Sequence, residues 1–142
     1  MSKINVGRVL LGGLVAGLVM NIGEFILNGV LFAKSMESDF RRLNLTPPGN
    51  EFIAKAVVLT FILGIVVVFL YAAIRPRFGT GVKTAIWAGL IAWFFVYVYA
   101  GIINGSLGFT SMNLVLVGIL WGIVEYTLGA VAGAFVYKEA DA

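Results

Sequence analysis

Four apolar runs, each long enough to cross a lipid bilayer, constrain this chain more than any other feature. About 20 consecutive apolar residues span the hydrocarbon core as a helix. Hydrophobic residues make up 61% of the 142 residues and charged residues 12%, whereas a soluble domain carries about 25% charged residues. We therefore expect an all-α membrane protein with a four-transmembrane-helix bundle. The single domain at 1-142 has expected spans at about 9-32, 56-74, 84-103 and 114-137.

The first run could also be a secretory signal peptide. The apolar stretch of such a signal covers about 7–15 residues. This run is longer and contains Asn21, Glu24 and Asn28. We therefore expect it to be retained as a membrane-spanning helix.

Basic residues at the ends of the runs predict the orientation in the membrane, because the cytoplasmic side carries an excess of Lys and Arg. Six lie on the side of the two termini and four on the other side. Both termini are therefore expected in the cytoplasm. The two groups are Lys3, Arg8, Arg75, Arg77, Lys83 and Lys138 against Lys34, Arg41, Arg42 and Lys55.

Two connections have their own pattern. Between the second and third runs, Pro76 is expected to end the helix, and Arg75, Arg77 and Lys83 are expected to contact lipid headgroups. In the first outer loop, we expect a short interfacial helix over 33–45, because a helix there would have its apolar and its charged residues on different sides. A solvated loop is the alternative for this segment.

Two interior faces are predicted from helical spacing, one on the first run and one on the fourth. Residues that follow one another at steps of four, three and four share one side of a helix. Lipid does not tolerate carboxylates, and small residues let membrane helices approach closely, so we expect the two faces to meet. The members are Gly17, Asn21, Glu24 and Asn28 in the first run and Gly118, Gly122, Glu125 and Gly129 in the fourth.

The two buried glutamates, Glu24 and Glu125, have no counter-charge inside the predicted spans. Burial disfavours a charged carboxylate, so we expect at least one of them to be protonated at neutral pH. The chain has no Cys and no His, which removes thiol nucleophiles, zinc sites and the usual haem ligands. We expect no metal site, no cofactor and no catalysis, and the net charge of +3 does not indicate a nucleic-acid surface.

Three roles for the glutamates stay open. They could fix helix pairing through hydrogen bonds, form a proton or cation site for transport, or bind a partner subunit, a lipid-soluble cofactor or a quinone. The first expectation is a non-catalytic helical-bundle subunit or small-ligand-binding module, and the alternative is a proton- or cation-coupled small transporter. Partners are the lipid bilayer and either copies of the chain or a larger membrane complex. The candidate ligand- or proton-binding residues are Glu24, Glu125, Asn21, Asn28 and the mid-span Trp93.

The segments Asn21-Ile22-Gly23-Glu24, 75–79 and 81–85 resemble those of a group of small uncharacterised bacterial four-helix membrane proteins. This resemblance covers nearly the whole chain and implies a bacterial inner membrane location, but it carries no functional residues across. A looser resemblance is to small multidrug-resistance transporters, which have four helices and a first-helix glutamate that exchanges protons for drug. Glu24 would be the matching position. The chain differs from these transporters in Glu125 and in its long first outer loop.

Overall fold

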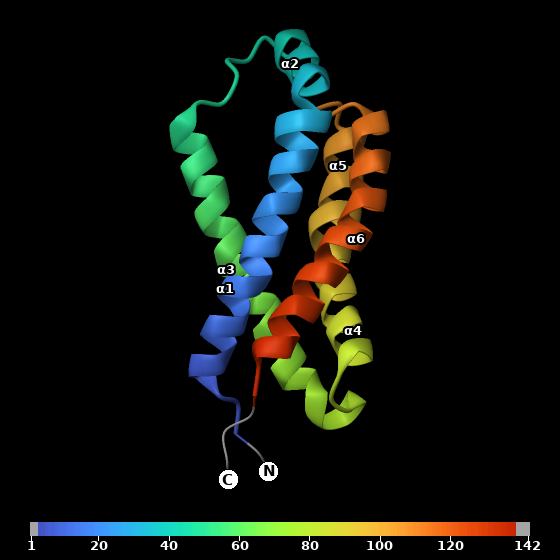
Figure 1. Ribbon diagram of the computed structural model, residues 1–142. Coiled ribbons are helices and arrows are strands. Elements are labelled where there is room, and N and C mark those ends of the chain that lie inside the picture. The colour runs from blue at the N-terminus through green and yellow to red at the C-terminus, as the bar shows by residue number, and fades with distance from the viewer. Residues whose placement is uncertain (1–2, 139–142) are drawn as a thin grey trace.

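The computed structural model describes residues 3–138, and the regular elements in this range are all helical (Figure 1). Two helices contain a π-helical segment, labelled η. The elements in chain order are α1 (Val6–Glu24), η1 (Phe25–Leu31), α2 (Ala33–Arg42), α3 (Asn50–Phe78), α4 (Val82–Trp93), η2 (Phe94–Tyr99), α5 (Ala100–Ser106) and α6 (Met112–Val136). They form four long helices over 6–31, 50–78, 82–106 and 112–136, each long and apolar enough to cross a membrane. The predicted fold class is confirmed.

The long helices turn most of their surface outward. The buried share of the apolar stretch runs from 17% in the third long helix to 39% in the fourth. Outward side chains such as Leu18, Phe69 and Leu120 are apolar and more than half exposed on the bundle. Such a surface is costly in water, at about 25 cal/mol per Å², and compatible with lipid. The fold is therefore that of a small multi-pass membrane protein.

The second long helix, α3, is longer at both ends than the predicted span. It begins at Asn50, where Glu51 and Lys55 form an ion pair at 2.7 Å one turn apart. Polar first turns of this kind lower the hydropathy but support the helix. The prediction that Pro76 ends this helix is wrong, because α3 continues to Phe78. A proline in the last turn removes only one backbone donor, and the chain leaves the helix at Gly79, whose φ of 82° favours glycine.

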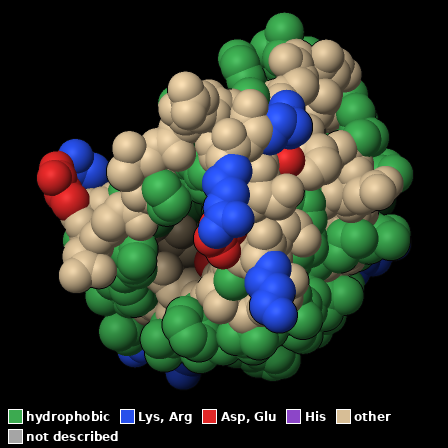
Figure 2. Space-filling model, turned by 90° about the horizontal axis from the view of Figure 1, so that it is seen from above, with side chains coloured by type: hydrophobic (Ala, Val, Ile, Leu, Met, Phe, Trp, Pro, Cys, Tyr) green, Lys and Arg blue, Asp and Glu red, His purple; other side chains and the backbone are tan. Residues whose placement is uncertain are grey.

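The short helix in the first outer loop is confirmed as α2, so the solvated-loop alternative is wrong. It ends at Arg42, three residues earlier than predicted, and Asn44 then adopts a left-handed φ of 57°. It lies at the end of the bundle opposite the termini (Figure 1). Viewed onto this end, charged side chains gather over the middle of the face (Figure 2), and Lys34, Glu37 and Arg41 of α2 are exposed there.

At the end near the termini the helices pack with backbone against backbone. A Cβ atom added to Gly12 would lie 2.6 Å from the carbonyl oxygen of Gly133, which joins α1 to α6. A Cβ atom added to Gly64 would collide with the backbone of Gly13 and Gly17, which joins α3 to α1. Small residues permit such close approach in membrane bundles.

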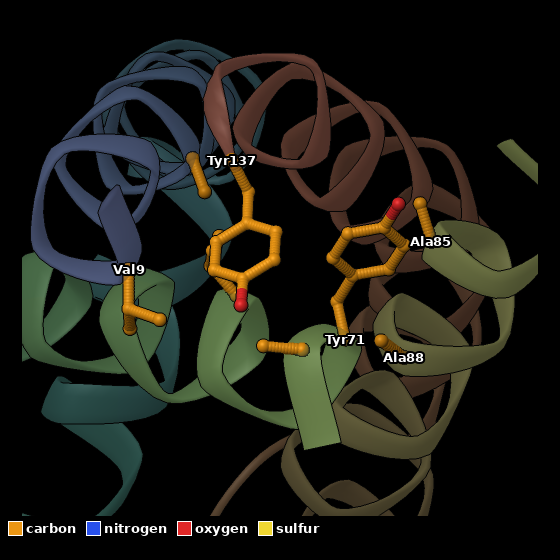
Figure 3. Close-up of a cluster of buried hydrophobic side chains, with 8 residues drawn as sticks. Val9, Tyr71, Ala85, Ala88 and Tyr137 are labelled. Atoms are coloured by element: carbon orange, nitrogen blue, oxygen red, sulfur yellow. The ribbon is translucent and has the colours of Figure 1, made fainter. Parts of the chain in front are cut away.

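Large aromatic side chains complete this end. The rings of Tyr71 and Tyr137 meet edge to face, with centroids 5.9 Å apart and planes at 88°, a favourable arrangement for aromatic pairs. Val9, Ala85 and Ala88 surround them (Figure 3). This half of the bundle is therefore closed.

Candidate functional site

The carboxyl group of Glu24 is held by two hydrogen bonds from different helices. Glu24 is the last residue of α1. The Tyr97 hydroxyl of η2 donates to Glu24 Oε1 at 3.0 Å, and Asn28 Nδ2 of η1 donates to Glu24 Oε2. Because each oxygen accepts a bond, the carboxyl group has one fixed orientation.

Glu125 lies deeper and is 5% exposed. Trp121 Nε1 donates to Glu125 Oε2 at 2.9 Å, whereas Glu125 Oε1 is buried without a hydrogen-bond partner among residues 3–138. The carboxyl group fits against Gly23, where a Cβ atom would lie 2.5 Å from Oε2. The glycine beside Glu24 therefore makes room for the second glutamate.

The two glutamates are close enough to interact electrostatically, and Tyr97 lies near both. Within the described part of the chain, neither forms an ion pair. Ion pairs do join exposed or partly exposed side chains near α2 and at the start of α3. They include Glu37–Arg41, Asp39–Arg42 and Glu51–Lys55.

Glu24, Glu125, Tyr97, Asn28 and Trp121 together form what we call the polar centre, and both π-helical segments lie at it. η1 follows directly on Glu24 and carries Asn28, while η2 carries Tyr97. A π-helical turn places backbone bonds five residues apart and changes the direction of the side chains that follow, and such turns are frequent at functional sites. Here the two segments bring a phenol and an amide onto the same carboxyl group.

A cavity of about 360 Å³ extends from this polar centre to the α2 end of the bundle. Glu24, Asn28 and Tyr97 line its deep part, while α2 and the 107–111 connection line its mouth. Its walls are mainly apolar. They include Leu27, Phe32, Met36, Val96, Leu114 and Val115.

Asp39 connects the two sides of this mouth, α2 and the 107–111 connection, by hydrogen bonds. Its carboxylate accepts hydrogen bonds from the backbone N–H of Ser111 at 2.9 Å and from the Ser111 hydroxyl at 2.8 Å. Arg42 donates to the same carboxylate at 3.1 Å. Partial burial raises the pKa of Asp39, but the bonds from Ser111 and the charge of Arg42 outweigh this, so the pKa lies below its usual value. Asp39 also places a negative charge at the N-terminus of α6, where the helix dipole favours it.

Two predicted ligand residues lie outside the cavity. The amide of Asn21 donates to Gly17 O at 2.9 Å and to Val57 O at 3.4 Å, so it faces α3. Trp93 Nε1 donates to Ile119 O at 2.8 Å, which places this ring in the contact between α4 and α6. Only Glu24 and Asn28 of the five candidates line the cavity, with Glu125 packed beside them.

The predicted faces of the first and fourth runs meet only in part: Glu125 of α6 packs against Gly23 of α1, but three of the four predicted glycines contact other elements. Gly17 packs on Phe61 of α3, whereas Gly118 and Gly122 lie against Tyr97 of η2. Gly129 does face α1, through Met20. Helical spacing determines which residues share a side of one helix, but it does not determine which neighbouring helix that side contacts.

The predicted headgroup residues lie at the end near the termini. Arg77 and Lys83 are exposed there. The guanidinium group of Arg75 instead lies over the ring of Tyr137, 5.6 Å from its centroid, in cation–π geometry.

Sequence reasoning missed Tyr97, Gly23 and Trp121 in the polar centre and Asp39 at the mouth. Tyr97 carried a usable signal, because a phenol in the middle of a membrane span needs a hydrogen-bond partner. Asp39 gave none, since its partner Ser111 is 72 residues away.

Fold and site together define a small multi-pass membrane protein with an interior cavity that ends at a fixed carboxyl group. Searches against protein-family models, curated proteins and solved structures give no match. The resemblances to the small bacterial four-helix proteins and to small multidrug-resistance transporters therefore stay predictions.

Proposed function

We propose that this protein is a non-catalytic membrane protein that binds a small molecule in the cavity between η1, η2 and α6. The observation that carries the proposal is that the cavity reaches Glu24, a carboxyl group already oriented by Tyr97 and Asn28. Its volume of about 360 Å³ falls within the range of small-molecule sites, about 300–1,000 Å³. Apolar walls with a few convergent polar groups are also typical of such sites.

The two glutamates have different roles in this proposal. Glu24 faces the cavity and contacts the ligand. Glu125 is packed against Gly23 and bonded to Trp121, and it supports the contact between α1 and α6. The purely structural role is thereby assigned to one glutamate and the binding role to the other.

We place the protein in the bacterial inner membrane with both termini in the cytoplasm, on the basis of the Lys and Arg excess at that end. The cavity then opens on the opposite side, under α2. The outward apolar surfaces of the long helices leave room for further copies of the chain or for a larger membrane complex.

The test is a comparison of bound small molecules in the wild type and in Ala100→Phe. Ala100 lines the cavity, so a phenyl group there fills it. Both proteins are incubated with a small-molecule extract of cells, washed in detergent and analysed by mass spectrometry, with circular dichroism as the check of folding. The proposal predicts a species retained by the wild type and lost from folded Ala100→Phe. Identical retained species in the two proteins would contradict it.

Coupled transport is the second candidate function, and one observation favours it. The buried Glu125 Oε1 has no hydrogen-bond partner among residues 3–138 and lies in a carboxyl group that interacts with Glu24. Such an acid could hold a proton that a ligand at Glu24 displaces. In vesicles containing a pH-sensitive dye, the ligand identified above would then drive proton flux in the wild type and none in Glu125→Gln. If the wild type bound this ligand without proton flux, coupled transport would be contradicted and only the binding function would remain.

A further inference from the structure

We infer that the cavity takes a small organic cation, with its positive charge at Glu24 and its apolar body along the aromatic walls. This inference rests on the proposed binding function and names its ligand class. The charged side chains that line the cavity are Glu24 in its deep part and Asp39 at its mouth, and its lining contains no Lys or Arg. The ionisable side chains of the lining are therefore acidic, and Arg42 at the mouth pairs with one of them, Asp39.

Glu24 has capacity left for a ligand. Each of its oxygens accepts one bond from the protein, whereas a carboxylate offers about four acceptor positions. Asp39, in contrast, accepts hydrogen bonds from Ser111 and forms an ion pair with Arg42, so its charge is compensated at the mouth and Glu24 is the acidic group of the lining that a ligand can use. A cleft lined by one sign of charge with apolar walls concentrates ions of the opposite sign.

The remaining lining favours an organic over an inorganic cation. Phe32, Phe40, Tyr97 and Phe109 place aromatic rings around the cavity, and aromatic faces attract alkylated ammonium groups. Hard metal cations need about six or more oxygen ligands. In the described part of the chain, no three Asp, Glu, His or Cys side chains converge on one point.

An ammonium group can reach the cavity from two sources. It can belong to a water-soluble amine that enters at the mouth, or to the headgroup of a membrane lipid such as phosphatidylethanolamine. The chemistry at Glu24 is the same in both cases. The experiment below therefore includes an arm for the lipid.

The absence of cysteine from the chain permits a direct test. Ala100→Cys places one thiol in the cavity wall. Its rates of modification by a trimethylammonium and by a sulfonate methanethiosulfonate reagent are measured in uncharged detergent and divided by the rates with a free thiol. We expect the cationic reagent to be favoured by about tenfold or more. Glu24→Gln should remove most of that preference, while the matched variant Glu37→Gln on the exposed side of α2 should keep it.

Equal corrected rates for the two reagents, or a cation preference that Glu24→Gln leaves unchanged, would overturn the inference while leaving the cavity itself in place. No reaction with either reagent in a protein shown to be folded would instead overturn the proposed binding cavity and this inference together. In the lipid arm, phosphatidylethanolamine is added before the cationic reagent. Slower modification would assign the ammonium group to the lipid, and an unchanged rate would exclude that source in favour of a water-soluble amine.

Discussion

The two ends of this bundle are built from the same four helices but differ in packing: one end is tightly packed and the other contains a cavity. Toward the termini, backbone meets backbone at Gly12 and Gly133 and at Gly13 and Gly64, where an added Cβ atom would collide with the neighbouring helix. Near α2, the first half of α3 diverges from α1 (Figure 1), and large side chains line a cavity of about 360 Å³ around Glu24. Close packing at the closed end depends on glycines, which have no side chain. At the open end, hydrogen bonds between side chains hold the residues around the cavity in place.

The difference shows how a short membrane chain can combine stability with a binding site. In lipid, helices associate through close packing and polar contacts, because burial of apolar surface brings little advantage there. The glycine contacts provide that packing at one end. The other end is then free to keep a cavity, whose mouth is bordered by α2 and the bond between Asp39 and Ser111.

The largest effect is expected from adding one methyl group at the closed end. In Gly64→Ala, the new Cβ atom would collide with the backbone of Gly13 and Gly17, so we expect a loss of about 3 kcal/mol in unfolding free energy. Gly118→Ala is the matched control, since its Cβ atom would meet Tyr97 at an ordinary 3.5 Å. Thermal unfolding in detergent, followed by circular dichroism, measures both. Equal losses in the two variants would contradict the distinction between the ends.

A smaller loss is expected at the boundary between the two ends. Gly23→Ala brings a Cβ atom to within 2.5 Å of Glu125 Oε2, which should cost about 2 kcal/mol. Adding Glu125→Ala removes the collision, so the double variant should lose less than the sum of the single losses. Strict additivity of the two unfolding free energies would show that Gly23 and Glu125 do not touch.

The attachment of α2 should contribute less again and should depend on pH. Asp39→Asn removes the carboxylate that accepts from Ser111 and Arg42, at an expected cost of about 1 kcal/mol at pH 7. Because the pKa of Asp39 is lowered in the folded protein, this contribution is complete above about pH 4, the unfolded value, and is lost as the pH falls through the folded pKa. Unfolding of wild type and variant from pH 7 to pH 3 measures it. A difference that is already lost between pH 7 and pH 5 would contradict this assignment.

The smallest effect on stability is expected at the deep end of the cavity. Glu24→Gln keeps an oxygen that can accept from Tyr97, so the unfolding free energy should change by less than about 1 kcal/mol. The same variant should lose the retained small molecule, as seen by mass spectrometry. If it retained that molecule at wild-type level, Glu24 would not be the binding group.

The sequence allowed the helices to be predicted but not which helices their faces contact. Long apolar runs, the amphipathic α2 and the interior position of Glu24 and Glu125 follow from bilayer thickness and the cost of a carboxylate in lipid. Helix ends were less predictable, because Asn50, Glu51 and Lys55 are polar and yet helical.

The polar centre could not be predicted from the sequence of a single helix, because its contacts join different helices. Steps of three and four residues placed Asn21 beside Glu24, but Asn21 turns toward α3 while Glu24 turns toward Tyr97. The π-helical turns that begin after Glu24 and after Trp93 also change the direction of later side chains. No regular spacing rule for an α-helix predicts that change.

The most direct test of the account compares two single-cysteine variants in the middle of the bundle. Ala100 lines the cavity, whereas Ala16 of α1 is 0% exposed and packs against Gly129 and Gly133 of α6. With an uncharged, water-soluble thiol reagent and folded protein in detergent, Ala100→Cys should react readily and Ala16→Cys should not. If Ala100→Cys proved as unreactive as Ala16→Cys, the bundle would be closed at both ends and the cavity at Glu24 would not exist in solution.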